Sequence, residues 1–423
     1  MMTNTSLQQE TLTASLKQKS RSKWVADFAK SQIIKRLQSM QKGRLTVIDG
    51  SEKHTFGQSD EIRTTIYVHD SRFYGEIAFG GSIGAGEAYM LGYWTTDNLT
   101  DVIRLMCLNQ TVMDTLEGGY QWLTKPFLQI LHWLNSNTTE GSRKNIAAHY
   151  DLGNDMFALF LDPTMMYSSA IFNAETPSLQ AASKLKLKTI CDKLDLKTTD
   201  KVVEIGTGWG GFAIYAATHY GCHVTTTTIS TQQYELAKAR VKSAGLEGKI
   251  TLLLEDYRDL QGKYDKLVSI EMIEAVGHQF YDTYFAKVGA LLKNDGLALI
   301  QAITIADQRY ENAKKSVDFI QRYIFPGSCI PSNTAMLNSV TKMSDLRLFD
   351  LEDIGPHYAT TLRFWRENFF ANIQEVRKLG YTDEFIKMWD FYLSYCEGGF
   401  MERALGDVHL LLAKPENRRQ ALI

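Results

Sequence analysis

The sequence predicts an α/β protein whose larger domain is a doubly wound sheet of parallel strands, preceded by a small α+β domain. Three observations predict this fold: strands alternate with helices after residue 200, a glycine-rich turn follows the first of these strands, and a polar stretch separates this region from the N-terminal part. A chain of 423 residues with 44% hydrophobic residues is long for one domain. We therefore expect an accessory domain over residues 1–135 and a larger domain over residues 146–423.

The first 44 residues are basic, although the whole chain has a formal net charge of only -2. Nine lysines and arginines lie there against Glu10 and Asp27. Such an arm can lie on anionic lipid, where each basic residue contributes about 1 kcal/mol, or it can be an ordinary solvated helix face. Its apolar residues do not form one continuous helical stripe. The sequence leaves both interpretations open.

Residues 43–78 alternate apolar and polar side chains and contain several glycines, a pattern typical of short antiparallel strands. We assign these strands to LTVIDG, TTIYVHD and FYGEIAF. The glycine-rich run of residues 80–94 looks like a phosphate loop but lacks its lysine and hydroxyl pair, so we do not expect phosphate binding. Residues 98–135 have helical periodicity, and the polar residues 135–145 are the expected linker.

Beyond the linker, strands and helices alternate along the chain. Strands are expected at residues 201–205, 223–229, 250–254, 266–270 and 297–303, and helices at residues 210–220, 232–244 and 280–292. Parallel strands joined by right-handed crossovers produce this alternation. In such a sheet, ligands bind at the carboxyl ends of the strands.

The turn after the first of these strands reads EIGTGWG over residues 204–210. Such turns serve nicotinamide, flavin and sulfonium cofactors alike. Here the glycine spacing differs from the one that holds a pyrophosphate on a helix N-terminus, and the acidic Glu204 precedes the first glycine. Both features favour S-adenosylmethionine, a cofactor without phosphates. The third strand end, EDYR at residues 255–258, offers a carboxylate and a ring for adenine, whereas Thr228-Ile229-Ser230 lacks the usual ribose-binding acid.

Composition argues against several other classes of protein. The near-neutral charge gives no basic field for nucleic acid. The five cysteines lie far apart, without the spacing of a zinc site or a disulfide framework, so we expect reduced thiols and no metal. No stretch approaches the roughly 20 apolar residues of a spanning helix, and the N-terminus is too polar for a signal peptide. These features predict a cytoplasmic protein.

Six ordered segments between residues 146 and 412 resemble the cyclopropane-fatty-acyl-phospholipid synthases and their mycolic-acid-modifying relatives. The segments are HYDLGNDMFALFLDPTMMYSSAIF, EIGTGWGGFA, EDYRDL, EMIEAVGH, RYIFPGSCIPS and HYATTLRFW. Near the N-terminus, GEAYMLGYW resembles the accessory domain of the larger members. The resemblance implies a Rossmann-like class I SAM-dependent methyltransferase domain with a small N-terminal α+β accessory domain. It also implies methyl transfer to the double bond of unsaturated acyl chains in membrane phospholipids, forming cyclopropane fatty acids.

The same resemblance implies which residues form the site. The implied cofactor contacts are Tyr167, Ser168, Gly206, Gly208, Thr228, Ile229, Gln233, Asp256 and Tyr257. An active-site carboxylate is implied at Glu274 and a tyrosine at Tyr358. Many members hold a bicarbonate base with a cysteine-containing loop, a glutamate, a histidine and a tyrosine, but here Ser169 replaces the cysteine and Gln301 the histidine. Glutamine can donate a hydrogen bond to an anion but cannot titrate, so bicarbonate binding is plausible and would be weaker.

An alkene is a poor nucleophile, so the sulfonium methyl must be held within about 3 to 3.5 Å of the double bond. The resulting carbocation needs a dry site lined by apolar or aromatic groups. FALFLDPTMMY and TLRFWRENFF have this composition, although such runs are also typical of an ordinary core. Glu274 would anchor the base that removes a proton, or it is a structural carboxylate at a helix start; Glu271 lies three residues earlier.

Several alternatives stay open at this stage. Neighbouring members of the family leave a methyl or methylene branch, so the product is undecided. A methyltransferase for a small soluble acceptor and a non-catalytic lipid- or cofactor-binding relative are the competing functions. The resemblance further implies a homodimer that binds peripherally to a phospholipid membrane surface, at its inner face.

Overall fold

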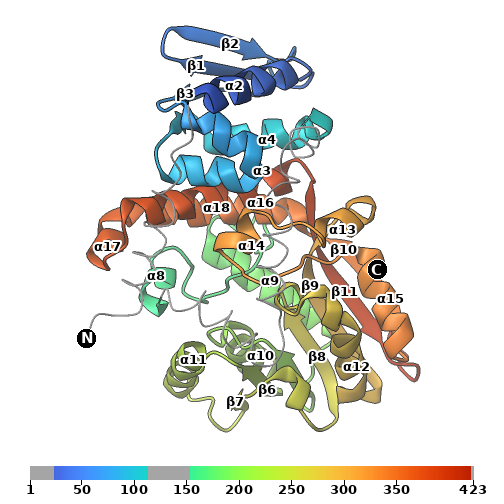
Figure 1. Cartoon of the computed structure of the whole chain (residues 1–423). Coiled ribbons are helices and arrows are strands. Elements are labelled where there is room, and N and C mark those ends of the chain that lie inside the picture. The colour runs from blue at the N-terminus through green and yellow to red at the C-terminus, as the bar shows by residue number, and fades with distance from the viewer. Residues whose placement is uncertain (1–22, 113–152, 421–423) are drawn as a thin grey trace. The chain divides into compact units, whose positions relative to one another are not determined.

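The computed structural model describes residues 23–112 and 153–420, which form two compact units (Figure 1). The first unit combines the described residues before 113 with Ser316–Ile324 and Ile373–Ala404, and the second contains the remainder. The sequence predicts two continuous domains, residues 1–135 and 146–423. This division assigns Ser316–Ile324 and Ile373–Ala404 to the second domain, whereas in the structure they belong to the first unit. The expected linker at residues 135–145 lies outside the described residues.

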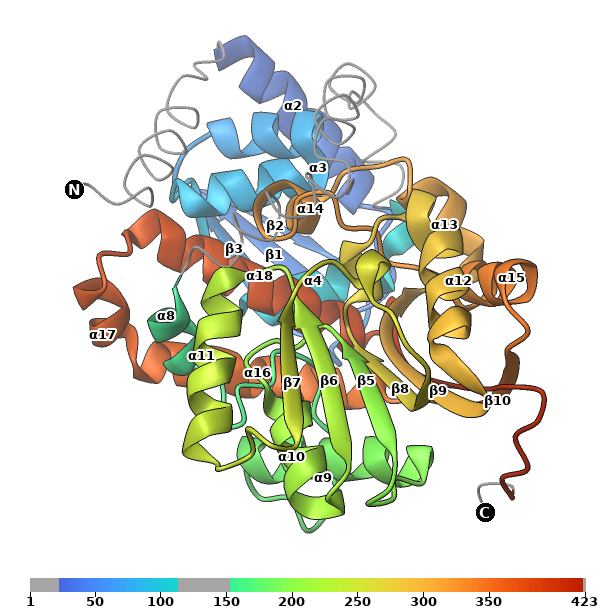
Figure 2. The same ribbon diagram turned by 90° about the horizontal axis from the view of Figure 1, so that it is seen from below.

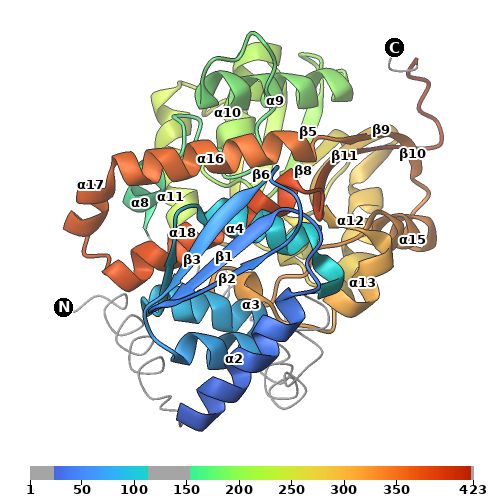
Figure 3. The same ribbon diagram turned by 90° about the horizontal axis from the view of Figure 1, so that it is seen from above.

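The first unit is built on a sheet of order β2-β1-β3-β4. The strands are β1 (Arg44–Asp49), β2 (Glu52–Phe56), β3 (Arg63–Val68) and β4 (Trp94–Thr96), of which the first three are seen side by side in Figure 3. The helices are α2 (Lys23–Leu37), α3 (Arg72–Met90), α4 (Leu99–Leu108), α14 (Phe319–Tyr323), α17 (Ile373–Lys378) and α18 (Asp383–Met401). β1 runs antiparallel to β2 but parallel to β3, so the expectation of antiparallel strands throughout is wrong.

Helix α3 contains two segments that the sequence interpreted otherwise. FYGEIAF, assigned to a strand, forms its start, because Phe73, Tyr74 and Ala78 recur at helical spacing and are all buried. The glycine run of residues 80–94 supplies most of the rest and contains a kink at Gly81, whose φ is 54°. At Gly86 an added Cβ would overlap the ring of Phe319 from α14. The glycines of this run therefore permit close packing within the unit.

Residues 23–44 do not form a free basic arm. Ala29, Ile33 and Leu37 recur every four residues along α2 and are buried, and α2 packs against α3. The ammonium of Lys30 lies 2.6 Å from Asp49 and 3.0 Å from Glu52, so its charge is neutralised within the unit. Residues 1–22, which carry the remaining arm, lie outside the described residues.

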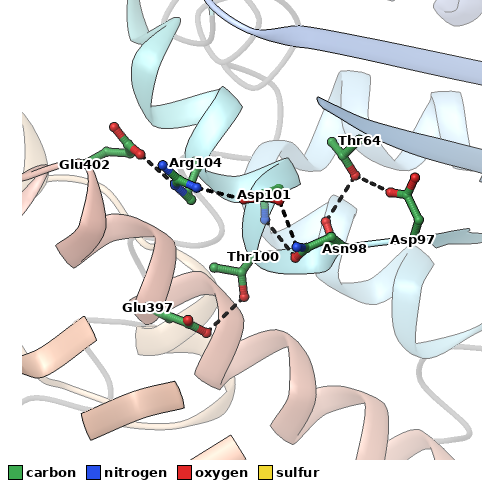
Figure 4. A network of polar contacts seen from close by, with 8 residues as sticks. All are labelled: Thr64, Asp97, Asn98, Thr100, Asp101, Arg104, Glu397 and Glu402. Atoms are coloured by element: carbon green, nitrogen blue, oxygen red, sulfur yellow. Dashed lines mark hydrogen bonds and ion pairs between the residues drawn. The ribbon is translucent and has the colours of Figure 1, made fainter. Parts of the chain in front are cut away.

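A polar network joins α4 to α18 (Figure 4). Asn98 caps α4 by accepting from the backbone N–H of Asp101. Farther along the helix, the hydroxyl of Thr100 donates to Glu397 at 3.0 Å, and Nε of Arg104 donates to Glu402 at 2.7 Å. These bonds, together with the packing of α18 on α3 and α4, explain why a segment almost 300 residues later in the chain belongs to this unit.

The second unit contains a seven-stranded sheet of order β10-β11-β9-β8-β5-β6-β7. The strands are β5 (Lys201–Ile205), β6 (His223–Thr228), β7 (Ile250–Leu254), β8 (Tyr264–Ile270), β9 (Leu292–Ile305), β10 (Arg347–Asp353) and β11 (Leu405–Ala413). Figure 2 shows β5 to β9, which are parallel, side by side. The five predicted strands and the predicted fold class are therefore confirmed; the antiparallel pair β10 and β11 was not predicted.

Helices pack on both faces of this sheet. They are α8 (Asn154–Ala158), α9 (Leu179–Leu194), α10 (Gly211–Tyr220), α11 (Thr231–Ser243), α12 (Tyr281–Leu291), α13 (Asp307–Ala313), α15 (Asn333–Met343) and α16 (Gly355–Ala371). Neighbouring residues of β5 point to opposite faces: Val203 joins a core cluster that includes α12 and α15, whereas Val202 joins one that includes α9 and α10. Among the described residues, no helix combines the length and hydropathy needed to cross a bilayer. The five cysteines are free.

Candidate active site

The turn after β5 presents backbone rather than side chains at the carboxyl edge of the sheet. Gly206, Gly208 and Gly210 have φ angles of 101°, 51° and 83°, which L side chains rarely adopt. A Cβ added at Gly208 would meet nothing within 4 Å. The turn therefore leaves open space at Gly208, in which a ligand could approach the backbone; the sequence predicts cofactor contacts at Gly206 and Gly208.

The end of β6 lies next to this turn, because β5 and β6 are adjacent parallel strands. Thr228 is the last residue of β6 and Ile229 follows it. The hydroxyl of Thr228 donates to Oε1 of Gln233 at 2.9 Å, and Ser230 caps α11 by accepting from the Gln233 N–H. Three predicted cofactor residues, Thr228, Ile229 and Gln233, are thus brought together at one strand end.

The end of β7 supplies Asp256 and Tyr257. The carboxylate of Asp256 is almost fully buried and accepts two 2.7 Å bonds from the guanidinium of Arg258. The ring of Tyr257 packs in the core, edge-on to Tyr284 with centroids 5.6 Å apart. Asp256 is therefore held at the predicted strand end, whereas the Tyr257 ring, expected to stack on adenine, lies in the core.

A loop that precedes α9 brings Tyr167 and Ser168 to the same edge. Arg240 of α11 fixes this loop: its guanidinium donates to the carbonyl of Trp209 in the glycine turn and to the carbonyls of Pro163 and Thr164. The ring of Tyr167 lies 5.2 Å from that of Trp365, measured between centroids. The hydroxyl of Ser168 accepts a 2.6 Å bond from the fully buried ammonium of Lys186.

Three groups that the sequence singled out donate hydrogen bonds to one carboxylate, that of Glu271. The backbone N–H of Ser169 and the amide Nε2 of Gln301 donate to Oε1, at 2.8 and 2.7 Å. The hydroxyl of Tyr358 donates to Oε2 at 2.6 Å. These donors come from the loop before α9, from β9 and from α16. We call Ser169, Glu271, Gln301 and Tyr358 the Glu271 cluster.

The position of Glu274 corrects the expectation that it shares a hydrogen-bond set with Tyr358. Its Oε1 accepts from the backbone N–H of Ile303 at 2.5 Å, and its Oε2 is buried without a hydrogen-bond partner among the described residues. Glu271 directly follows β8, where its N–H donates to the carbonyl of Gln301, so its side chain lies over β9 closer to Tyr358. Burial and repulsion by Glu271 raise the pKa of Glu274 to about 8.

Further titratable side chains surround the Glu271 cluster. Asp407 accepts from Nε2 of Gln301 at 2.9 Å, and burial together with repulsion by Glu271 raises the pKa of Asp407 well above its usual value. The ring of His409 lies 3.3 Å from Oε1 of Gln301, and burial keeps its pKa low, so the ring is neutral. Burial lowers the pKa of Lys186 to about 8. None of these three residues was predicted from the sequence, although Asp407 and His409 are polar residues two apart in an apolar strand.

The Glu271 cluster adjoins both the glycine turn and a group of aromatic rings. Met272 lies against Gly206, where an added Cβ would be 3.3 Å from its Cγ. The ring of Tyr358 is edge-on to Trp365 with centroids 6.0 Å apart. A partly buried proton acceptor is therefore placed beside aromatic rings, which tolerate positive charge.

The chain matches the model of a family described as mycolic acid cyclopropane synthetase over residues 137–410. It is 38% identical to the tuberculostearic acid methyltransferase UfaA1 of Mycobacterium tuberculosis over 367 residues, which cover 84% of each chain. It is 37% identical to the cyclopropane-fatty-acyl-phospholipid synthase of Escherichia coli over 343 residues, which cover 80% of this chain and 85% of that protein.

Solved structures with the same fold include two cyclopropane synthases. The cyclopropane synthase MmaA2 from Mycobacterium tuberculosis matches with a TM-score of 0.59 and 28% identity, over 64% of this chain and 98% of its own. The mycolic acid cyclopropane synthase CmaA1, complexed with SAH and CTAB, matches with the same TM-score, identity and coverage. The match to the family model, over residues 137–410, includes the glycine turn and the Glu271 cluster.

Proposed function

The chain belongs to the mycolic acid cyclopropane synthetase family, and on that premise we propose that it methylates the double bond of unsaturated acyl chains in membrane phospholipids, forming cyclopropane fatty acids. The protein is a SAM-dependent methyltransferase of the cyclopropane-synthase type. One observation carries the finer proposal: a partly buried carboxylate with three hydrogen-bond donors adjoins both the glycine turn and the aromatic group around Trp365.

The residues at the carboxyl edge of the sheet fit S-adenosylmethionine. The open backbone at Gly208 suits its amino acid group, since no side chain there would block the approach, and the adjacent Gly206 lies against Met272. Thr228 and Gln233 offer polar groups for ribose, and Asp256 offers a carboxylate for the adenine amino group. When bound, S-adenosylmethionine supplies an electrophilic methyl group.

The chain's own residues would then control what happens to the lipid. The π electrons of the alkene form the new bond to the methyl carbon, and positive charge develops on the other alkene carbon. Tyr167 and Trp365, whose rings lie 5.2 Å apart, present aromatic faces near the Glu271 cluster that would stabilise this charge. Loss of a proton from the transferred methyl group closes the ring, so the site also requires a base.

A second product is favoured by one comparison. The 38% identity with a tuberculostearic acid methyltransferase, over 84% of both chains, suits an enzyme that leaves a methyl or methylene branch. Both products start from the same methylated carbocation. Loss of a methyl proton with ring closure gives the cyclopropane. A hydride shift from the methylated carbon to the cationic carbon, followed by loss of a methyl proton, gives the methylene branch, and a saturated methyl branch needs a hydride donor in addition. The two proposals are therefore distinguished by the product alone.

We further propose that the protein binds peripherally to the cytoplasmic face of a phospholipid membrane, because its substrate would reside there. We also propose that it acts as a homodimer, as the family resemblance implies. Lys17, Lys19 and Arg21 are the basic residues best suited to anionic lipid. Flotation with anionic vesicles should show binding that weakens as salt is raised. Deletion of residues 1–22 should remove most of this binding, and light scattering would give the oligomeric state.

The direct test is mass spectrometry of fatty acids after incubation with S-adenosylmethionine and vesicles of monounsaturated phospholipid. The proposal expects each modified chain to gain one CH2 unit, and chromatography against cyclopropane, methyl and methylene standards identifies the product. Parallel reactions contain small soluble acceptors and no vesicles. If only these acceptors are methylated, or if no lipid gains mass while the cofactor binds, the lipid substrate is wrong.

A further inference from the structure

The residues expected to hold a bicarbonate base already hold another anion. Ser169, Gln301 and Tyr358 all direct their hydrogen-bond donors to the side chain of Glu271, at 2.6 to 2.8 Å. A bicarbonate ion would need the same donors. It would also bring a second negative charge next to a partly buried carboxylate, which is costly. These residues therefore do not fit a bicarbonate in addition to Glu271.

We propose that Glu271 is itself the catalytic base and that its carboxylate takes the place of a bound anion. The inference deepens the proposed function and rests on it. In the proposed step, a C–H bond of the transferred methyl group breaks, and its electron pair forms the second carbon–carbon bond of the ring at the cationic carbon. The proton passes to the carboxylate of Glu271, which becomes a neutral acid. The step needs no further reactant.

The backbone at Glu271 supports this assignment. Its φ is 46°, in the left-handed region that side chains other than glycine rarely occupy. Residues held in such strained conformations cluster at functional sites, where the surrounding structure keeps them in place. Glycine would relieve the strain at this position but would remove the carboxylate. The strained residue therefore carries the side chain that accepts hydrogen bonds from the loop before α9, from β9 and from α16.

The surrounding charges localise the negative charge on Glu271. Glu271, Glu274 and Asp407 are neighbouring carboxyl groups. Of these, Glu271 accepts three hydrogen bonds and is attracted by the buried ammonium of Lys186. Glu274 accepts one bond and has a pKa raised to about 8, and burial and repulsion by Glu271 raise the pKa of Asp407 well above its usual value. When adjacent carboxyl groups differ in this way, one stays ionised while its neighbours hold protons.

Burial also raises the pKa of Glu271, an effect that its donors and Lys186 oppose. A carboxylate with a raised pKa is a stronger base than an exposed one. Gln301 donates to both Glu271 and Asp407, so it acts as a positioning residue that holds the carboxylate over the site. An amide in this position cannot compete for the proton, whereas a histidine could.

The first arm of the test uses the unmodified protein. Its methylation of monounsaturated phospholipid vesicles is measured in buffer freed of carbon dioxide and again with added bicarbonate. Glu271 as the base predicts equal rates. Full lipid methylation that depends on bicarbonate would overturn the inference and leave the proposed function intact, whereas no lipid methylation under either condition would remove the proposed function itself.

The second arm uses Glu271→Gln and Glu271→Gly, with the exposed Glu247→Gln as a control. Ring formation should fall at least about 100-fold in both Glu271 variants, and residual product should shift towards chains without a ring. Bicarbonate or formate should partly restore Glu271→Gly, which leaves room for an anion, but not Glu271→Gln. Unchanged binding of S-adenosylhomocysteine and unchanged thermal unfolding establish that the variants fold. Ring formation by Glu271→Gln at the wild-type rate would overturn the inference.

Discussion

The hydroxyl of Tyr358 donates a 2.6 Å hydrogen bond to Oε2 of Glu271 and thereby connects α16 to the end of β8. The other carboxylate oxygen is bound by Ser169 and Gln301, so both oxygens are fixed. The loop that carries Ser169 is itself attached to α16, because Thr361 accepts from the N–H of Ala170 at 3.0 Å. Helix α16 therefore positions both the carboxylate and one of its other donors.

Replacing Tyr358 by phenylalanine should slow lipid methylation with little effect on cofactor binding. The variant loses one donor to a partly buried anion, and the loss of such a donor in an active site typically costs about 100-fold or more in rate. Steady-state kinetics with vesicles gives the rate, and calorimetry gives the affinity for S-adenosylhomocysteine.

The control for this prediction is Tyr89→Phe in the first unit. It also removes a partly buried bond between a hydroxyl and a carboxylate, since Tyr89 donates to Asp390 at 2.7 Å. This variant should unfold at a lower denaturant concentration but retain full activity. A Tyr358→Phe enzyme as fast as wild type would show that the hydroxyl does not orient the carboxylate during the reaction.

Replacing Gly208 by alanine should weaken cofactor binding strongly. The Cβ would occupy open space in the free protein, so the folded structure tolerates it apart from the strain of a φ of 51°. That space is where we expect the cofactor to approach the backbone. Gly245→Ala is a matched control, because Gly245 has a φ of 68° and equally open surroundings on the far side of α11. Equal affinity of the two variants for S-adenosylhomocysteine would contradict the placement.

Local sequence patterns correctly predicted the parallel strands of the larger sheet but not the start of α3. The strands at residues 201–205 and 250–254 have the predicted bounds, because each is a short apolar run between polar or glycine residues. FYGEIAF was assigned wrongly because a short apolar run does not distinguish a strand from a buried helix. The packing of α3 against α2 and α18 decides the outcome, and these are tertiary contacts.

Local sequence patterns also could not decide which carboxylate lies at the centre of the site. The motif EMIEAVGH contains two glutamates, and sequence reasoning chose Glu274 from the resemblance. The left-handed backbone at Glu271 and its distance from Tyr358 depend on β8, β9 and α16 together. Asp407 lies in β11, an antiparallel strand that the alternation of strands and helices did not reveal. Local patterns located the site, and tertiary structure identified its central carboxylate.

Two glycines of α3 should respond to alanine in opposite directions. At Gly86 the new Cβ would overlap the ring of Phe319, so we expect destabilisation of about 1 to 3 kcal/mol. At Gly80 nothing lies within 4 Å, and alanine should stabilise the helix by roughly 0.5 to 1 kcal/mol. Denaturant unfolding followed by circular dichroism measures both. Equal stability of the two variants would contradict the packing of Ser316–Ile324 in the first unit.

Glu204 should make stability depend on pH. Its carboxyl group is buried in β5, where Oε2 accepts from Thr226 at 2.6 Å, and burial raises its pKa from 4.5 to about 8. Between these values the folded chain holds a proton that the unfolded chain has released. The free energy of unfolding therefore falls as pH rises through this window, and below about 4.5 the group has no effect.

Glu204→Gln removes this titration. The free energy of unfolding of wild type falls by about 1.4 kcal/mol for each pH unit crossed in this window. The stability of the variant relative to wild type should therefore increase by a few kcal/mol between about pH 5 and about pH 8. Lys186, whose pKa is lowered to about 8, contributes in the opposite sense only at higher pH. Denaturation midpoints across this range, followed by tryptophan fluorescence, provide the measurement, with the exposed Glu247→Gln expected to follow wild type. A constant difference between Glu204→Gln and wild type at every pH would mean that Glu204 titrates normally in the folded protein.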